Sequence, residues 1–294
     1  MIKLPLFLVF LAFFCGCQKS SLYMAKDFTE SGSFTKEAEG PAVDKKGNLY
    51  AVSYEYKETI GKLTPKGEGE VYIKMPKGST ANGIRFSKKE DMYIADYTGH
   101  NILKADSAGK VSIYAHNKNM NQPNDIAMME KGILFASDPN WSQGTGQLWR
   151  INLDGSTTLM EKEMGTTNGI EVSPDETKLY VNESKQLNLW VYEIDEKANL
   201  QNKKLFYKFK DGGLDGMRCD KKGNLYVTRY SKGEVVKISP AGKLLRTIKL
   251  KGLKPTNIAF GGPDGKTCYV TVADRGNIEF FRTDTAGRSW EMRK

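Results

Sequence analysis

The chain repeats one unit six times, and this repeat constrains its fold more than any other feature. In each copy an oxygen-bearing residue opens a short apolar stretch, a turn follows, and an aromatic residue stands 11 or 12 positions later. Successive copies are 42 to 47 residues apart. The opening residues are Glu39, Asn82, Asn124, Asn168, Asp215 and Asn257. The aromatic residues are Tyr50, Tyr93, Phe135, Tyr180, Tyr226 and Tyr269. Short strands with a period near 40–45 residues are typical of propeller blades.

Each unit has room for four strands. Third strands are predicted at 60–63, 102–105, 148–151, 189–192, 235–238 and 278–281, and fourth strands follow at segments such as 111–114 and 244–247. No long helical period interrupts them. The pattern predicts an all-β chain, a six-bladed β-propeller of four-stranded blades that occupies residues 36–294 as one domain.

The opening residues predict where a site would lie. Equivalent positions of successive blades fall on one ring around the propeller axis. The alternative is that asparagine and aspartate only start strands and turns in each blade. Oxygen-bearing side chains at all six positions, with Glu39 and Asp215 among them, favour a converging polar cluster.

The amino terminus predicts export. Lys3 precedes an apolar run at 4–14, which is typical of a signal peptide and too short to span a bilayer comfortably. Gly16-Cys17 resembles a bacterial lipoprotein box, so residues 1–16 are the expected signal peptide and Cys17 the expected lipidated residue. This places the protein in the bacterial cell envelope, periplasmic or on the outer surface, with ordinary secretion as the alternative. Residues 17–35 form a predicted polar tether, whose end at 33–35 is the candidate for a strand that closes the ring.

Charge and cysteine content exclude other classes. The formal net charge is +9, but the basic residues are spread through turns rather than gathered with aromatic residues on one element. Nucleic-acid binding is therefore not expected, and a lipid at Cys17 is the only expected membrane contact. Cys219 and Cys268 lie inside predicted strands and are expected to be buried free thiols.

Four short segments carry a resemblance to a known family. They are Glu39-Gly40-Pro41, Pro123-Asn124-Asp125, Asn168-Gly169-Ile170 and Asp215-Gly216-Met217. In type and order they resemble the senescence-marker-protein/gluconolactonase/luciferin-regenerating-enzyme family, to which diisopropyl fluorophosphatase is related. The resemblance implies a six-bladed propeller with a divalent ion on its axis, usually calcium, and hydrolysis of lactones or organophosphates. Position by position, it implies Glu39, Asn124, Asn168 and Asp215 as metal ligands, with Asp215 also the base or nucleophile.

The residue chemistry agrees with calcium. Hard cations prefer oxygen ligands, and two carboxylates with two amide oxygens balance the charge of the ion. No histidine or cysteine joins the ring, which argues against zinc, although Mg²⁺, Mn²⁺ or Zn²⁺ are alternatives. An ion there polarises a lactone carbonyl, and a carboxylate base is still needed, for which Asp215 and Asp125 are the candidates.

One position departs from the family pattern. Sugar-lactone members usually have an arginine two residues before the asparagine of blade three, and here that position is Gln122. This argues against polyhydroxylated or anionic lactones as substrates. Asn82, Gln122, Asp138 and Asn257 are the predicted substrate-binding residues. For Asp138, as for Asp96 and Glu183 at the ends of other second strands, the alternative is a solvated loop acid.

Two functions from different classes follow. The first is a calcium-dependent hydrolase of lactones or related esters. The alternative is a non-catalytic propeller that binds a ligand or protein partner and holds calcium only for structure, because propellers host many functions.

Overall fold

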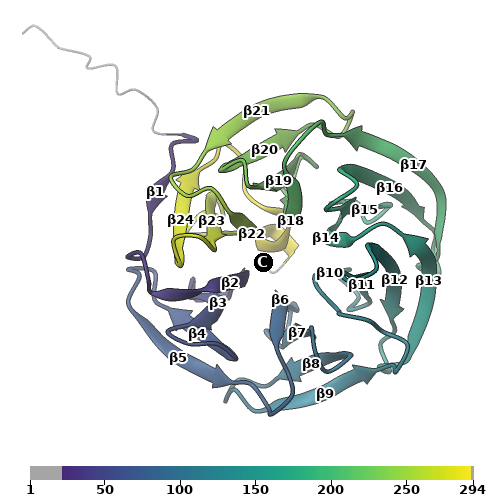
Figure 1. Cartoon of the computed structure of the whole chain (residues 1–294), viewed down its shortest axis with the longest axis horizontal. Helices are drawn as coiled ribbons and strands as arrows, with labels where there is room; N and C mark the ends of the chain where they lie inside the picture. The colour runs from purple at the N-terminus through teal and green to yellow at the C-terminus, as the bar shows by residue number, and fades with distance from the viewer. Residues whose placement is uncertain (1–21, 293–294) are drawn as a thin grey trace, which may run out of the picture.

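The computed structural model describes residues 22–292 and shows the predicted six-bladed propeller (Figure 1). Within these residues there are 24 strands and one short helix, arranged as six four-stranded antiparallel sheets. Cys17 and the predicted signal peptide lie outside the described residues, so lipidation stays a prediction that mass spectrometry of the mature amino terminus would test.

The first three blades follow one another along the chain. Blade one contains β2 (Phe34–Val43), β3 (Leu49–Tyr54), β4 (Thr59–Leu63) and β5 (Gly69–Lys74). Blade two contains β6 (Ala81–Phe86), β7 (Met92–Asp96), β8 (Asn101–Ala105) and β9 (Val111–His116). Blade three contains β10 (Ile126–Met128), β11 (Leu134–Asn140), β12 (Thr145–Ile151) and β13 (Thr157–Met164).

The last three blades complete the ring. Blade four contains β14 (Thr167–Val172), β15 (Lys178–Glu183), β16 (Asn188–Ile194) and β17 (Leu200–Lys208). Blade five contains β18 (Gly213–Cys219), β19 (Leu225–Tyr230), β20 (Glu234–Ile238) and β21 (Leu244–Lys249). Blade six contains β22 (Pro255–Gly261), β23 (Thr267–Val272), β24 (Asn277–Arg282) and β1 (Lys26–Asp27). The first strand of each of these sets, such as β6 or β18, lies nearest the axis (Figure 1).

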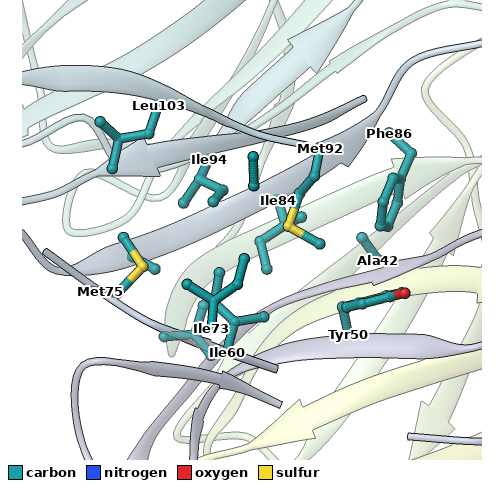
Figure 2. Close-up of a cluster of buried hydrophobic side chains, with 13 residues drawn as sticks. Ala42, Tyr50, Ile60, Ile73, Met75, Ile84, Phe86, Met92, Ile94 and Leu103 are labelled. Carbon is teal, nitrogen blue, oxygen red and sulfur yellow. The ribbon is translucent and has the colours of Figure 1, made fainter. Parts of the chain in front are cut away.

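The core lies between blades rather than in one central mass. Six clusters of buried side chains are each drawn from two neighbouring blades. Figure 2 shows the cluster between blades one and two, where Ile60, Ile84 and Ile94 are fully buried. Because blades are covered on both faces, their middle strands are apolar on both sides instead of alternating strictly. Cys219 and Cys268 lie in this interior as free thiols, as predicted.

The strand that closes the ring is not the predicted one. Phe34 begins β2, the inner strand of blade one, whereas β1 pairs with β24 as the outer strand of blade six. Phe28 fixes β1 by edge-on contacts with Tyr269 and Phe280, at centroid distances of 4.8 and 6.0 Å. The predicted tether therefore belongs to the propeller from residue 22 onward, because its apolar and charged side chains pack on blade six.

A short helix, α1 (Arg288–Met292), lies at the centre of the ring in projection (Figure 1). Its Arg288 donates to the carbonyls of Ser173 and Met128 at 3.1 and 3.0 Å and pairs with Glu176 at 2.6 Å. Through Arg288, the C-terminal helix therefore contacts both blade three and blade four near the propeller axis. Nowhere in residues 22–292 is a helix long and apolar enough to cross a membrane.

Candidate functional site

The predicted ring residues converge on the axis. The residue after each ring position is glycine in blades one, two, four and five, because the next inner strand lies against it. A side chain at Gly83 would collide with Asp125, and one at Gly216 would collide with the Asn257 side chain. The Gly83 N–H also donates to the Asn124 carbonyl at 2.8 Å. Neighbouring inner strands therefore touch at the level of the ring.

The ring presents oxygen atoms without partners. The Oδ1 atoms of Asn82 and Asn168 are buried and accept no hydrogen bond from any of residues 22–292. Buried polar oxygens are normally paired, so an unpaired one in a native structure points to a missing ligand such as an ion. In residues 22–292 no three His, Cys, Asp or Glu side chains gather as a metal site. A cation site here therefore depends on asparagine oxygens together with the two carboxylates.

The two carboxylates of the ring, Glu39 and Asp215, repel each other electrostatically. Burial raises the pKa of Glu39 to about 7, although the Gly40 N–H donates to its Oε2 at 2.7 Å. Burial and then the Glu39 charge raise the pKa of Asp215 well above its ordinary value, against a hydrogen bond from Asn168. Neither carboxylate forms an ion pair with any described residue. A bound cation would neutralise both, so the donor set fits a hard divalent ion.

Asp125 is held differently from the ring carboxylates. It is fully buried, with Arg85 Nη2 at 3.1 Å from Oδ1 and Arg218 Nη1 at 3.0 Å from Oδ2. Burial opposes ionisation, but the Arg218 and Arg85 guanidiniums hold the pKa of Asp125 below its ordinary value. Asp125 is therefore an ionised carboxylate whose charge is balanced by two arginines next to the ring. The two arginines were not predicted, although each stands three residues after a ring position.

Asp138 binds a loop rather than lining an open pocket. Its carboxylate accepts from the N–H groups of Asn121 and Gln122 at 2.9 and 2.6 Å and from Trp149 Nε1 at 2.9 Å. It is fully buried, so neither substrate binding nor the solvated alternative describes it. Gln122 Oε1 in turn accepts from the Trp141 N–H at 3.2 Å. Asp138 thus places the loop that carries Asn124.

Asn257 supports a ring carboxylate from behind. It is 1% exposed, its Oδ1 accepts from the Ile258 N–H at 2.9 Å, and its amide donates to Glu39. Asn257 therefore contacts Glu39, and its role in substrate binding stays a prediction. Asn82, by contrast, lines an open cavity of about 250 Å³ beside Glu39. Ser53, Tyr97 and Tyr230 line the same cavity and were not predicted.

These features define a class of protein: a six-bladed propeller with an axial ring of oxygen-bearing side chains and a side cavity next to it. The family model described as the SMP-30/gluconolactonase/LRE-like region matches residues 37–274. The chain therefore belongs to this family, as the resemblance of its four segments predicted.

Curated relatives and solved structures agree. The chain is 28% identical to the gluconolactonase of Zymomonas mobilis over 286 residues, which covers 85% of this chain and 79% of that protein. It is 26% identical to the diisopropyl-fluorophosphatase of Loligo vulgaris, with 89% and 93% covered. The calcium-binding regucalcin of Agrobacterium tumefaciens superposes with a TM-score of 0.76 at 21% identity, covering 88% of this chain and 96% of that one. This last likeness shows the shared fold.

Proposed function

We propose that the chain hydrolyses lactones or related esters with a divalent cation, calcium foremost, on the propeller axis. The main supporting observation is the pair of recessed carboxylates, Glu39 and Asp215, neither of which forms an ion pair with any of residues 22–292. Asp125, by contrast, forms ion pairs with two arginines. The charges of Glu39 and Asp215 are thus left for a cation to balance. Membership of a family whose relatives include a gluconolactonase and a pentonolactonase supports the reaction class.

Glu39, Asn124, Asn168 and Asp215 are the residues that would hold the ion. When bound, calcium supplies a positive charge that polarises a carbonyl oxygen. Asn168 donates to the Asp215 carboxylate and Asn257 to that of Glu39, so each carboxylate is oriented by an amide. Pre-oriented groups of this kind lose little entropy when a ligand arrives.

Between the two candidate bases, the geometry favours Asp215. A proton acceptor needs a free oxygen and an affinity for the proton. Both oxygens of Asp125 lie against guanidiniums, which lower its pKa, and it has no exposed surface. Asp215 remains partly exposed on the ring. We therefore assign Asp215 the role of base and Asp125 a role in positioning the ring.

The test is Asp215→Asn, which keeps an oxygen for the ion but removes the proton acceptor. Loss of a general base typically costs 10²–10⁴-fold in rate, so kcat should collapse while calcium affinity, measured by titration calorimetry, falls less steeply. Asp154→Asn, the same change in an exposed turn, is the control and should keep full activity. Full activity in Asp215→Asn would disprove the base. Absence of any lactone or ester hydrolysis in the wild type with calcium would favour the binding-module alternative.

A further inference from the structure

Blade one differs from blades two, three and four at the end of the second strand, as do blades five and six with Arg229 and Val272. Blades two, three and four carry Asp96, Asp138 and Glu183 there, three residues after the aromatic residue. Each of these acids accepts a backbone N–H from the loop that precedes its own inner strand. Blade one has Ser53 at this position, and its inner strand β2 begins at Phe34 within a continuous stretch. Ser53 therefore has no loop to hold.

Ser53 nevertheless adopts a costly backbone conformation. Its φ is +65°, in the left-handed region that residues with a Cβ seldom occupy. Such conformations cost of order 1–3 kcal/mol and persist where the surroundings enforce them, often at functional sites. Ser53 is 3% exposed, and its hydroxyl makes no hydrogen bond to any of residues 22–292. It lines the same cavity as Glu39.

The rest of the cavity wall is mostly apolar. Ala38, Val52, Ala81 and Ala273 line it together with the rings of Tyr97 and Tyr230. The polar residues that complete the wall are Lys36, Glu37, Thr80 and Thr256. Burying a methylene group against such a wall contributes about 0.8 kcal/mol. Hydroxyl groups of a polyhydroxylated ligand that lie against this apolar part of the wall would be unpaired, at roughly 1–3 kcal/mol each. The wall thus favours an apolar substituent with one polar group that reaches Ser53.

We propose that this cavity is the subsite for the non-reacting part of the substrate and selects alkyl- or aryl-substituted lactones and esters. Ser53 donates a hydrogen bond to the one polar atom that enters, and the apolar wall takes the substituent. This inference rests on the proposed function and narrows its substrate class. This substrate class agrees with the presence of Gln122, whose amide oxygen already accepts a hydrogen bond from the Trp141 N–H.

Three probes with one ring size test the selectivity, each with the full chain and calcium. They are δ-valerolactone, δ-decalactone, which adds a five-carbon tail, and glucono-δ-lactone, which adds hydroxyl groups. We expect kcat/KM for δ-decalactone to exceed that for δ-valerolactone roughly 10- to 100-fold. Glucono-δ-lactone should be the poorest of the three. If it is instead the best, the subsite assignment is overturned while the proposed hydrolase stands.

Two variants locate the effect. Ser53→Ala keeps the backbone geometry and removes the donor, so kcat/KM should fall roughly 5- to 10-fold, as expected for one hydrogen bond. Ser231→Ala is the matched control, because Ser231 has φ +67° but lies exposed in a turn. Ala273→Leu fills the cavity and should lower activity on δ-decalactone while sparing δ-valerolactone. Equal losses on both substrates at an unchanged melting temperature would contradict the subsite.

A binding experiment separates this inference from the proposed reaction. If the wild type hydrolyses none of the probes, an alkyl-substituted δ-lactam is titrated by calorimetry in the presence of calcium. Binding that Ala273→Leu abolishes would keep the apolar subsite and refute only the hydrolase. Absence of binding would overturn both.

Discussion

At the scale of single residues, the acids in and around the site have different roles. Glu39 and Asp215 lie on the ring and form no ion pair with any of residues 22–292, Asp125 lies between two arginines, and Asp138 accepts hydrogen bonds from a loop. What distinguishes them is the set of donors around each carboxylate. Chemical type alone is therefore insufficient to assign a role, and the groups around each carboxylate decide it.

Asp138 offers a prediction at this scale. Asp138→Ala leaves the N–H groups of Asn121 and Gln122 and the Trp149 indole N–H without their acceptor. Unpaired buried donors cost roughly 1–3 kcal/mol each, and partial hydration would recover some of that, so we expect a loss of about 3 kcal/mol in the free energy of unfolding. Urea denaturation measures it. Glu163→Ala, at an exposed acid in the same blade, should change stability by less than about 0.5 kcal/mol. A loss of similar size in both variants would refute the loop-holding role.

At the scale of elements, the repeat predicted the blades well and the irregular pieces poorly. Inner and middle strands were predictable because the aromatic residue and apolar run recur in every copy. The closing strand β1 has two charged residues and no alternation, so only its pairing with β24 identifies it. Helix α1 has five residues, fewer than two turns, and shows no readable period.

The ring residues were predictable for the same reason as the blades, since they stand at one position of the repeat. Ser53 could not be predicted in this way, because it is a serine where blades two, three and four have an acid and so does not follow the repeat. The hydrogen bonds of Asp138 could not be predicted either, since its partners include backbone N–H groups, which no sequence pattern displays.

The closing strand carries a prediction on pH. Hydrogen bonds from Arg275 and Lys251 lower the pKa of Asp27 to about 2, against burial, while its ordinary value is 3.8. A carboxylate with a depressed folded-state pKa stabilises the fold above its unfolded-state pKa and loses that contribution as pH falls through its folded-state pKa. Asp27→Asn should therefore melt below the wild type at pH 7, with the gap closing between about pH 4 and pH 2. Thermal melts across that range measure it, and a gap that stays constant with pH would contradict the assignment.

At the scale of the whole molecule, the propeller is a ring closed in two places. On its rim, β1 joins the first part of the chain to blade six. On its axis, the proposed ligands Glu39, Asn124, Asn168 and Asp215 come from blades one, three, four and five. Each interblade core is shared by two neighbours, so separating any two blades exposes apolar surface. An ion held by four blades would add to that resistance at the axis.

This arrangement predicts that calcium stabilises the entire fold. A ligand that binds only the folded state stabilises it by about 2.7 kcal/mol when present at 100 times its dissociation constant. For a domain of this size that corresponds to a rise in melting temperature of roughly 5 °C. Differential scanning calorimetry with calcium, with magnesium and with a chelator measures the shift, which should be largest for calcium. Glu39→Gln should reduce the shift, because it removes one of the two charges that face the ion, and Glu163→Gln should leave it unchanged. Equal melting temperatures with calcium and with chelator would show that no ion links the blades, since a cation bound by four blades in the folded state alone must raise the free energy of separating them.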